Sequence, residues 1–210
     1  MSPVFNCQPA ASIEAVTSDG AANPRRAQII EVAADLFDKR GFHETTMQAI
    51  ADRTEIRKPS LYHYFRSKDE ILVELHETLM AVVISRHLNR LEAGGPGPRA
   101  ELRAMMRDVI GLMDSHPGYL RIFFESYREL PPEARTSVAA QRSRYQQMVA
   151  DVISAGTENG EFENVDPYLT SLAVLSLVNW SYQWFRPGGP LTTDEVADHF
   201  WSMLLNGIGA

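Results

Sequence analysis

The sequence is poor in cysteine and in long apolar runs. Cys7 is the only cysteine among the 210 residues, so no disulfide can form within the chain, and we expect a reducing, cytoplasmic location. No stretch approaches the roughly 20 consecutive apolar residues that a membrane-spanning helix needs. No lysine or arginine precedes Arg25, and the N-terminus has no compact apolar segment, so we expect neither a secretory signal nor a membrane partner.

Positive charge is scarce outside one part of the chain. All three lysines precede residue 69. Residues 25–68 hold nine Lys or Arg against six Asp or Glu, a net charge of +3, whereas residues 69–210 hold eleven against nineteen, a net charge of −8. A polyanion is therefore attracted to the first third of the chain and repelled by the rest.

Motifs that carry catalysis or metal binding are also missing. The sequence has no HExxH, no Walker loop, no CxxC and no GxSxG. We therefore predict no catalytic residues, no metal site and no cofactor, and we do not expect an enzyme. A small all-helical enzyme stays an alternative.

What the sequence does contain, from residue 24 onward, is helical periodicity. Asn23-Pro24 is typical of a helix start, and Gly41 is well placed to end that helix. The capping-box pattern Thr45-x-x-Gln48 predicts a second, short helix, and Pro59 fits the first turn of a third helix that runs to Phe65.

Later start signals continue the helical pattern. Ser67-x-x-Glu70 opens a long helix, "GGPGP" at 94–98 interrupts the chain, and Asp166-Pro167 and Thr192-x-x-Glu195 open the last two helices. We find no alternating strand pattern and no internal repeat. The sequence therefore predicts an all-α fold of about nine helices.

The second and third predicted helices are short and lie about four residues apart, which is the helix-turn-helix pattern. The run RGFHETTMQAIADRTEIRKPSLYHYFRSKDEIL resembles the DNA-binding domain of the TetR family of transcriptional regulators. The landmarks of the resemblance are Gly41-Phe42, Thr45-Thr46, Ile50-Ala51, Leu61-Tyr62, Tyr64-Phe65 and Ser67-Lys68. Residues 1–23 lack helical periodicity and are predicted to form a disordered tail. The resemblance implies a three-helix DNA-binding domain (24–70) and a larger helical ligand-binding and dimerisation domain (71–210).

The resemblance also implies which side chains contact a double-stranded DNA operator. Thr45 and Thr46 would meet phosphates at the start of the second helix. Side chains at the start of the third helix would enter the major groove, and others nearby would grip the backbone. The predicted groove residues are Lys58, Pro59, Ser60 and His63, and the predicted backbone contacts are Tyr62, Tyr64 and Lys68.

Two positions depart from the family pattern. Glu55 stands in the turn where the family usually has glycine, so it must adopt the backbone angle that glycine provides, at a cost of about 1 kcal/mol. Arg57 stands where the family usually has a capping serine. It cannot cap the third helix with a short oxygen, but it adds a cation near the DNA.

The last two predicted helices are apolar on more than one side. The segment SLAVLSLVNWSYQWF and the residues Val196, Phe200 and Leu204 have more apolar surface than one core requires. A palindromic operator mirrors a protein two-fold axis, so we predict a homodimer through these helices. Burial within one subunit is the alternative interpretation.

Methionine and aromatic residues in the middle helices favour a pocket for a bulky apolar effector. The predicted lining residues are Met105, Met106, Val109, Met113, Phe123, Phe124, Tyr127, Tyr145, Met148, Trp180 and Trp184. Around Trp180, Trp184, Pro187 and Gly188 the chain resembles family members that respond to acyl-CoA thioesters and related lipid or steroid catabolites.

The chemistry of the effector stays open at the level of sequence. Arg121 and Arg128 would suit the phosphates of an acyl-CoA, whereas Glu125 and Glu129 would suit a cationic, drug-like ligand. The predicted function is a ligand-responsive transcriptional repressor that such an effector releases from DNA. The alternative is a helical protein–protein interaction module that does not bind DNA.

Overall fold

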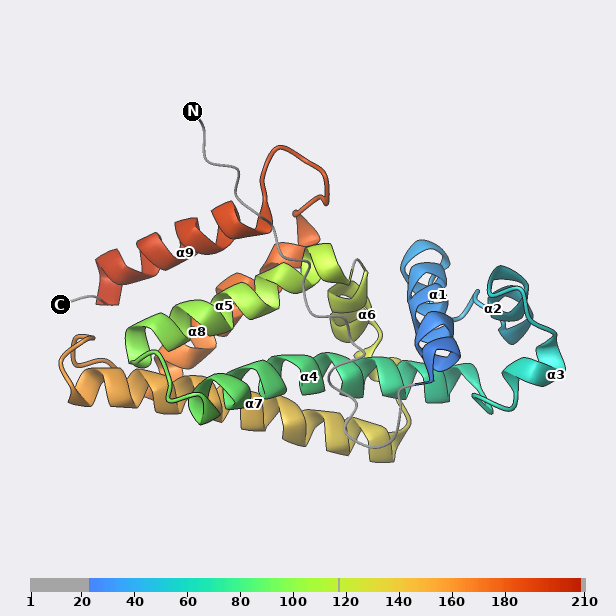
Figure 1. The fold of residues 1–210 in the computed structure, drawn as a ribbon, viewed down its shortest axis with the longest axis horizontal. Coiled ribbons are helices and arrows are strands. Elements are labelled where there is room, and N and C mark those ends of the chain that lie inside the picture. Colours follow the sequence, from blue (N-terminus) through green and yellow to red (C-terminus); the bar gives the residue numbers. More distant parts are fainter. Residues whose placement is uncertain (1–22, 117, 209–210) are drawn as a thin grey trace.

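A computed structural model describes residues 23–116 and 118–208 of the protein. Except for Asn23, the predicted tail lies outside the described residues. Within these ranges the regular elements are nine α-helices and two short 3-10 helices, which confirms the all-α prediction. Figure 1 shows a small group of helices at one end of a long helix, α4, and a larger group around the rest of it. We call these two parts the head and the bundle.

The head comprises α1 (Pro24–Arg40), α2 (Met47–Arg53), α3 (Lys58–Leu61) and the first turns of α4. The local signals for α1 are confirmed: the side chain of Asn23 accepts a hydrogen bond from the backbone of the first turn, and Gly41 ends the helix with a positive φ of 85°. Both features satisfy backbone groups that the helix ends leave unpaired.

Two predictions about the short helices need correction. The cap of α2 is Thr46, whose Oγ1 accepts from the amide of Ala49 at 3.1 Å, and not Thr45. The regular part of α3 ends at Leu61, although turn hydrogen bonds continue to Phe65. Adjacent threonines both fit a capping pattern, so the sequence alone misplaces this helix start by one residue.

Helix α4 (Lys68–Glu92) runs from the head into the bundle. The predicted capping box is confirmed, because the Oγ of Ser67 accepts from the amide of Glu70 at 3.2 Å. Along α4, Ile71, Leu72 and Leu75 are fully buried. One continuous helix therefore belongs to the cores of both parts.

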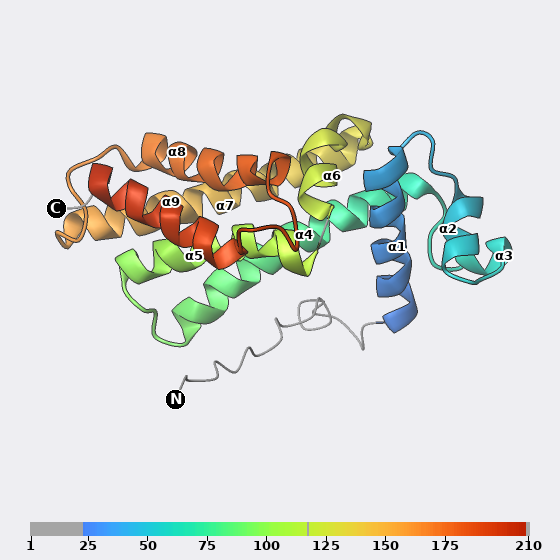
Figure 2. The ribbon, with the colours of Figure 1, turned by 90° about the horizontal axis from the view of Figure 1, so that it is seen from above.

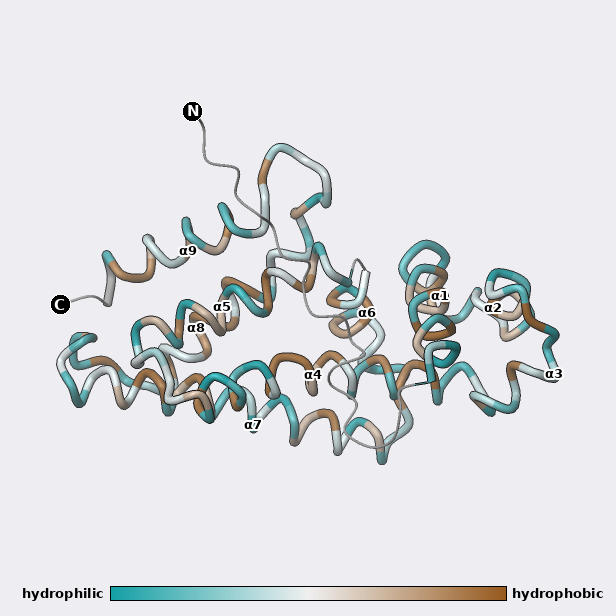
Figure 3. The backbone as a smooth tube through the Cα atoms, in the orientation of Figure 1, coloured by the Kyte–Doolittle hydropathy of each residue, from teal (hydrophilic) through white to brown (hydrophobic). Residues whose placement is uncertain are grey.

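The bundle consists of the remaining helices, in chain order: α5 (Pro98–Ser115), α6 (Tyr119–Glu125), η2 (Tyr127–Glu129), α7 (Pro132–Glu158), α8 (Pro167–Trp180), η3 (Ser181–Gln183) and α9 (Thr193–Ile208). Helix α5 is central and contacts α4, α6, α7, α8 and α9. Seen from above, α8 and α9 lie along one side of the bundle (Figure 2). The hydropathy colouring shows apolar segments on α8 and α9 as well as along α4 (Figure 3).

Helices α4 and α5 are also joined by buried charges. The carboxylate of Glu101 on α5 accepts from the Nδ1 of His87 at 2.7 Å and from the guanidinium of Arg90 at 2.8 Å. Arg90 also pairs with Asp108 at 2.7 Å. Burial raises the pKa of the Glu101 carboxyl, but the hydrogen bonds from Arg90 and His87 outweigh it, so the net pKa lies below its usual value. None of the described helices is long and apolar enough to cross a membrane.

Candidate DNA-binding head and effector cavity

The turn between α2 and α3 has the backbone geometry that the sequence predicted. Glu55 has a φ of 56° and is the one residue other than glycine with a positive φ among those described. The amide of Ile56 donates to the carbonyl of Ala51 at 3.0 Å, and the amide of Glu55 donates to the carbonyl of Asp52 at 3.2 Å. These two bonds form a Schellman motif, which normally has glycine at the position of Glu55.

Helix α3 begins at an exposed basic corner. The side chain of Arg57, at the N-cap position, makes no capping hydrogen bond, as predicted. Arg57, Lys58, Pro59, Tyr62 and His63 are exposed, while Leu61 and Phe65 are fully buried against the head. Ser60 and Tyr64 are partly buried. Helix α3, which carries the predicted groove residues, lies at the far end of the head (Figure 1).

Thr45 does not have the position that a phosphate contact requires. Its side chain is completely buried, and its Oγ1 lies 2.9 Å from the carbonyl oxygen of Gly41 and 3.2 Å from that of Leu36. The hydroxyl therefore holds the loop after α1 in place. Thr46 is exposed, and its side-chain oxygen caps the start of α2.

The side chain of Lys68 is also bonded within the protein. Its Nζ donates to the carbonyls of Phe42, His43 and Thr45 at 2.7, 3.0 and 3.1 Å, and it lies 4.5 Å from the centre of the Phe42 ring. An ammonium group has three N–H donors, so all of them are used. A phosphate contact would require one of these bonds to break, and Lys68 instead ties the start of α4 to the loop before α2.

Other basic residues of the head hold it together. The guanidinium of Arg26 pairs with Glu74 on α4, donates to the carbonyl of Tyr64 and lies 4.0 Å from the centre of the Phe65 ring. Arg25 donates to the carbonyl of Thr54 at 2.8 Å. Within the described residues, Arg57 and Lys58 have no such partner. Exposed Arg40 and Arg66 likewise have no ion-paired partner among the described residues, so the charge available to DNA lies at the start of α3, at Arg66 just after it and at Arg40.

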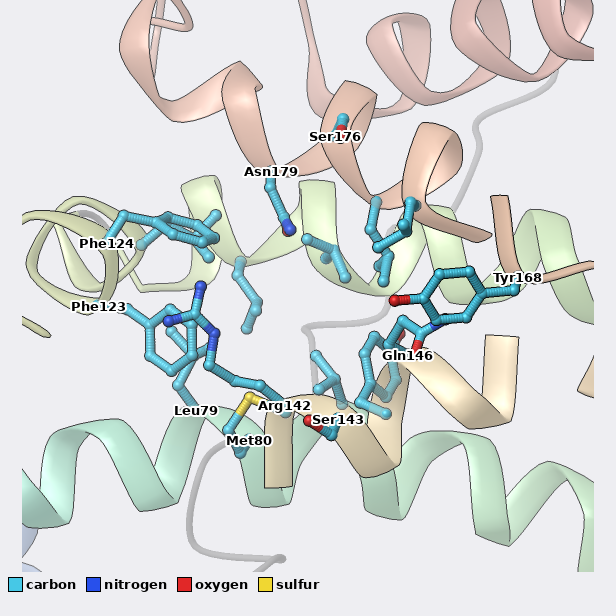
Figure 4. A pocket seen from close by; sticks show the side chains of 17 residues that line it. Leu79, Met80, Phe123, Phe124, Arg142, Ser143, Gln146, Tyr168, Ser176 and Asn179 are labelled. Carbon is cyan, nitrogen blue, oxygen red and sulfur yellow. The ribbon is translucent and has the colours of Figure 1, made fainter. Parts of the chain in front are cut away.

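The bundle encloses a cavity of about 360 Å³, which we call the central cavity. It lies between α4, α5, α6, α7 and α8, and Figure 4 shows the side chains that point into it. The lining residues are Leu79, Met80, Val83, Val109, Leu112, Leu120, Phe123, Phe124, Arg142, Ser143, Tyr145, Gln146, Tyr168, Leu172, Leu175, Ser176 and Asn179. The volume falls in the range of small-molecule sites.

The structure places only part of the predicted pocket at this cavity. Val109, Phe123, Phe124 and Tyr145 line it. Of the other predicted residues, Met105 and Met106 are buried in the core, Met113 faces a second hollow near α1, Tyr127 and Met148 pack beside the core, and Trp180 and Trp184 are 63% and 42% exposed. The sequence identified apolar residues correctly, but not the direction in which each side chain points.

Few polar residues line the cavity, and Arg142 is the only charged one among the described residues. The guanidinium lies 5.0, 5.5 and 5.1 Å from the ring centres of Phe123, Phe124 and Tyr127. Burial lowers the pKa of Arg142, although Tyr127 partly offsets this. Arg121, Arg128, Glu125 and Glu129, which sequence left as alternatives, do not line the cavity. Sequence reasoning missed Arg142, because this residue stands in the polar stretch "QRSRYQQ".

Helix α6 contacts both the cavity and the head. Phe123 and Phe124 line the cavity, while Arg121 pairs with Asp38 of α1 at 3.0 Å. Gly118 comes so close to α1 that an added Cβ would lie 3.1 Å from Asp38. The buried His76 of α4 lies 3.2 Å from the carbonyl oxygen of Phe123. A ligand that displaces Phe123 or Phe124 would thus act on elements that touch α1 and α4.

The outer side of α8 is apolar and uncovered. Leu169 and Trp180, which do not line the central cavity, are each 63% exposed, and Tyr168 and Leu172, at the edge of that cavity, are 56% and 40% exposed. Met203 on α9 is 47% exposed. By contrast, Val178 and Leu204 are buried within the subunit. Exposed apolar patches of this kind usually mark surfaces that interact with another molecule.

A basic helix-turn-helix head joined by one helix to a cavity-bearing bundle is the arrangement of a DNA-binding regulator with a ligand-sensing domain. Residues 29–75 match the family described as bacterial regulatory proteins, tetR family, and residues 95–208 match the tetracyclin repressor-like C-terminal domain. The chain therefore belongs to the tetR family, and the interpretation as a module that never touches DNA loses its support.

Individual relatives agree with this assignment. The HTH-type transcriptional repressor KstR2 of Mycobacterium tuberculosis is 30% identical over 191 residues, which is 90% of this chain and 95% of that protein. The structure of that ketosteroid transcriptional regulator has a TM-score of 0.81 at 28% identity, covering 91% of this chain and 98% of the other. AibR in complex with isovaleryl coenzyme A and operator DNA has a TM-score of 0.75 at 30% identity, covering 85% and 97%.

Proposed function

We propose that this chain is a ligand-responsive transcriptional repressor. It binds a palindromic operator as a homodimer, and a bulky apolar effector in the central cavity releases it. The observation that carries the proposal is the position of α6, which lines the cavity with Phe123 and Phe124 and contacts α1 through Arg121. The KstR2 relatives, which are transcriptional repressors, support it.

The DNA contacts come from the exposed corner of the head. Lys58, Pro59, Ser60 and His63 enter the major groove and read base edges, while Arg57 adds positive charge next to the phosphates. Two copies related by a two-fold axis place two such corners in successive major grooves, about 34 Å apart. The uncovered apolar side of α8, with α9 beside it, is the surface through which the copies pair.

The effector enters the central cavity with an apolar body. An acyl-CoA thioester is our first candidate, and AibR, whose structure contains isovaleryl coenzyme A, supports this choice by analogy. Coenzyme A itself is far larger than a cavity of about 360 Å³. The acyl group therefore occupies the cavity, and the coenzyme extends out of it past the exposed Ser143 of α7.

Release follows from linkage. An effector lowers operator affinity only if it binds the non-operator arrangement of the two heads more tightly than the operator arrangement. A tenfold loss of operator affinity needs about 1.4 kcal/mol of differential binding. Displacement of α6 changes its contacts with Asp38 on α1 and with His76 on α4, and contacts of this kind supply free energy of that size.

The test is selection of operator sequences from random DNA, followed by anisotropy titrations with the selected duplex. We expect a palindromic consensus, dimeric stoichiometry, and a slope of log affinity against log salt that shows several phosphate contacts. Isovaleryl-CoA, decanoyl-CoA and a ketosteroid are then added to the complex. Enrichment of no consensus would refute the DNA-binding part, and a complex that no effector class weakens would refute the release mechanism.

A further inference from the structure

Arg142 stands out because it is the one charged side chain that lines the central cavity among the described residues. Figure 4 shows its guanidinium between Phe123 and Phe124, at the opposite end of the cavity from Tyr168. Three aromatic rings surround it at 5.0 to 5.5 Å. Aromatic faces attract a cation, but they accept few of the five N–H bonds that a guanidinium can donate.

No carboxylate or carbonyl in the described part of the chain accepts a hydrogen bond from Arg142. This distinguishes it from the other partly buried arginines of the bundle. Arg90 pairs with Glu101 and Asp108, Arg86 contacts Asp108, and Arg121 pairs with Asp38. Burying a charged group without a hydrogen-bonded partner is costly. The guanidinium of Arg142 therefore keeps N–H donors free to bind an anionic ligand in the cavity.

The rest of the lining restricts the charge of that ligand further. None of the described lining residues is an aspartate or a glutamate, so nothing in the cavity would neutralise a cationic ligand. Leu79, Val83, Val109 and Leu112 offer an apolar wall from α4 and α5. The cavity is thus complementary to an amphipathic molecule with an apolar body and one acidic group.

We propose that Arg142 binds a negatively charged group of the effector, a carboxylate or a phosphate, while the apolar body fills the remainder of the cavity. A guanidinium binds either group through two parallel N–H···O bonds. The proposal deepens the function proposed above and rests on the central cavity being the effector site. It excludes cationic, drug-like molecules as effectors.

Binding of the anion also acts on the signalling element. Phe123 and Phe124 belong to α6, and the ring of Phe123 lies 5.1 Å from that of His76 on α4. Two new hydrogen bonds from Arg142 to an acidic group compete with its position over these rings. The anion therefore changes the packing of α6 directly, and a neutral analogue of the same shape does not.

The test measures ligand binding by calorimetry in the absence of DNA. The probes are decanoic, isovaleric and cyclohexylacetic acids, each as the free acid, the primary amide and the CoA thioester. The variants are Arg142→Gln, Arg142→Lys and the control Arg144→Gln, which removes the same charge from an exposed position on the same helix. Circular dichroism checks that each variant folds.

We expect at least one apolar body to bind to the unmutated protein about tenfold or more tightly as an acid or thioester than as an amide. Arg142→Gln removes this preference, Arg144→Gln keeps it, and Arg142→Lys reduces it because an ammonium lacks the planar fork. A tighter free acid identifies a carboxylate as the recognised group, and a tighter thioester identifies a phosphate. If Arg142→Gln does not fold, the comparison of Arg142→Lys with Arg144→Gln decides.

Three results would overturn the inference: equal binding of amide and anion, a preference that survives in Arg142→Gln, or no binding by any anionic probe. Because no DNA is present, these results are separate from those for the proposed function. Arg142-dependent binding without operator release would contradict the repressor mechanism alone. Operator release by an effector whose affinity does not change when Arg142 is substituted would contradict only the proposed role of Arg142.

Discussion

Charged side chains beneath the DNA-reading surface of the head and beside the central cavity of the bundle are used in opposite ways. In the head, Arg26 and Lys68 make several internal bonds each, to carbonyls, a carboxylate and ring faces. In the bundle, Arg142 faces a cavity, lies near three aromatic rings and has no hydrogen-bonded or ion-paired partner among the described residues. The outer surfaces differ as well, since the start of α3 is basic and the outer side of α8 is apolar.

The difference follows from what each part must recognise. Reading base edges requires side chains held in fixed positions, so polar groups beneath the reading surface are bonded to the backbone. A sensor must leave room and unsatisfied interactions for its ligand, because only these give the ligand a differential affinity. Helix α6 connects the two parts, and the following predictions test the contrast from the largest expected effect to the smallest.

The largest effect is expected on the apolar surface of α8. Leu169 is 63% exposed, and in the proposed dimer Leu169→Asp buries an unpaired charge, which costs about 3 kcal/mol or more. We expect a folded monomer with greatly reduced operator affinity, seen by sedimentation and circular dichroism. Leu91→Asp, at an exposed position on α4, is the control and should stay dimeric. A monomeric unmutated protein at micromolar concentration would falsify the dimer.

The second prediction concerns Lys68. Lys68→Met removes three charge-assisted hydrogen bonds to backbone carbonyls, so the free energy of unfolding should fall by about 2–3 kcal/mol. Lys58→Met removes the same charge from an exposed site and should change stability by less than about 0.5 kcal/mol while weakening DNA binding. Denaturant titrations measure both. Equal stability of the two variants would show that Lys68 does not brace the head.

This contrast shows what sequence reasoning reaches and what it misses. The start signals at Asn23, Ser67, Asp166 and Thr192 are all confirmed, because a cap depends on residues two or three positions away. The positive φ of Glu55 was predicted from the resemblance to the TetR family, in which glycine usually occupies this turn position. The position of Lys68 was missed as a brace, because its carbonyl partners lie 23 to 26 residues earlier in the chain.

The cavity was harder to predict than the helices. Apolar type indicates burial, but it does not say whether a buried side chain faces a void or a neighbour, as Met105 and Val109 show on the same helix. Trp180 and Trp184 were placed in the pocket and are instead exposed. Arg142 was missed because an arginine among polar residues is usually solvated, and only the packing of α6 against α7 shows otherwise.

The third prediction concerns pH and the buried His76 between α4 and α6. Its two ring nitrogens lie 2.9 and 3.2 Å from the carbonyl oxygens of Leu72 and Phe123. Burial lowers its pKa below the ordinary 6.5, more than these two hydrogen bonds raise it. The folded state therefore binds fewer protons than the unfolded state below about pH 6.5, and stability falls as pH decreases, by at most about 1.4 kcal/mol per pH unit for one proton.

His76→Gln keeps a hydrogen-bonding side chain but does not titrate. We expect its unfolding free energy to depend less steeply on pH between 7 and 5 than that of the unmutated protein. The partly buried His116, whose pKa is also lowered by burial and by Arg86, contributes equally to both proteins, so the difference isolates His76. Parallel curves would mean that His76 does not couple protonation to the packing of α6.

The smallest effect is expected at the turn that aims α3. Glu55 adopts a φ of 56° at the glycine position of a Schellman motif, so Glu55→Gly should relieve strain and raise the free energy of unfolding by about 1 kcal/mol. Glu44→Gly is the matched control: it stands in the loop before α2 without a positive φ, and glycine there should lower stability through backbone entropy. Glu55→Gln removes the charge alone, so it should strengthen DNA binding without stabilising the fold. Changes of opposite sign in the unfolding free energies of the two glycine variants would support a head whose turn is fixed by its backbone, in contrast to a bundle that leaves room for a ligand. A destabilised Glu55→Gly would show that the turn is not strained.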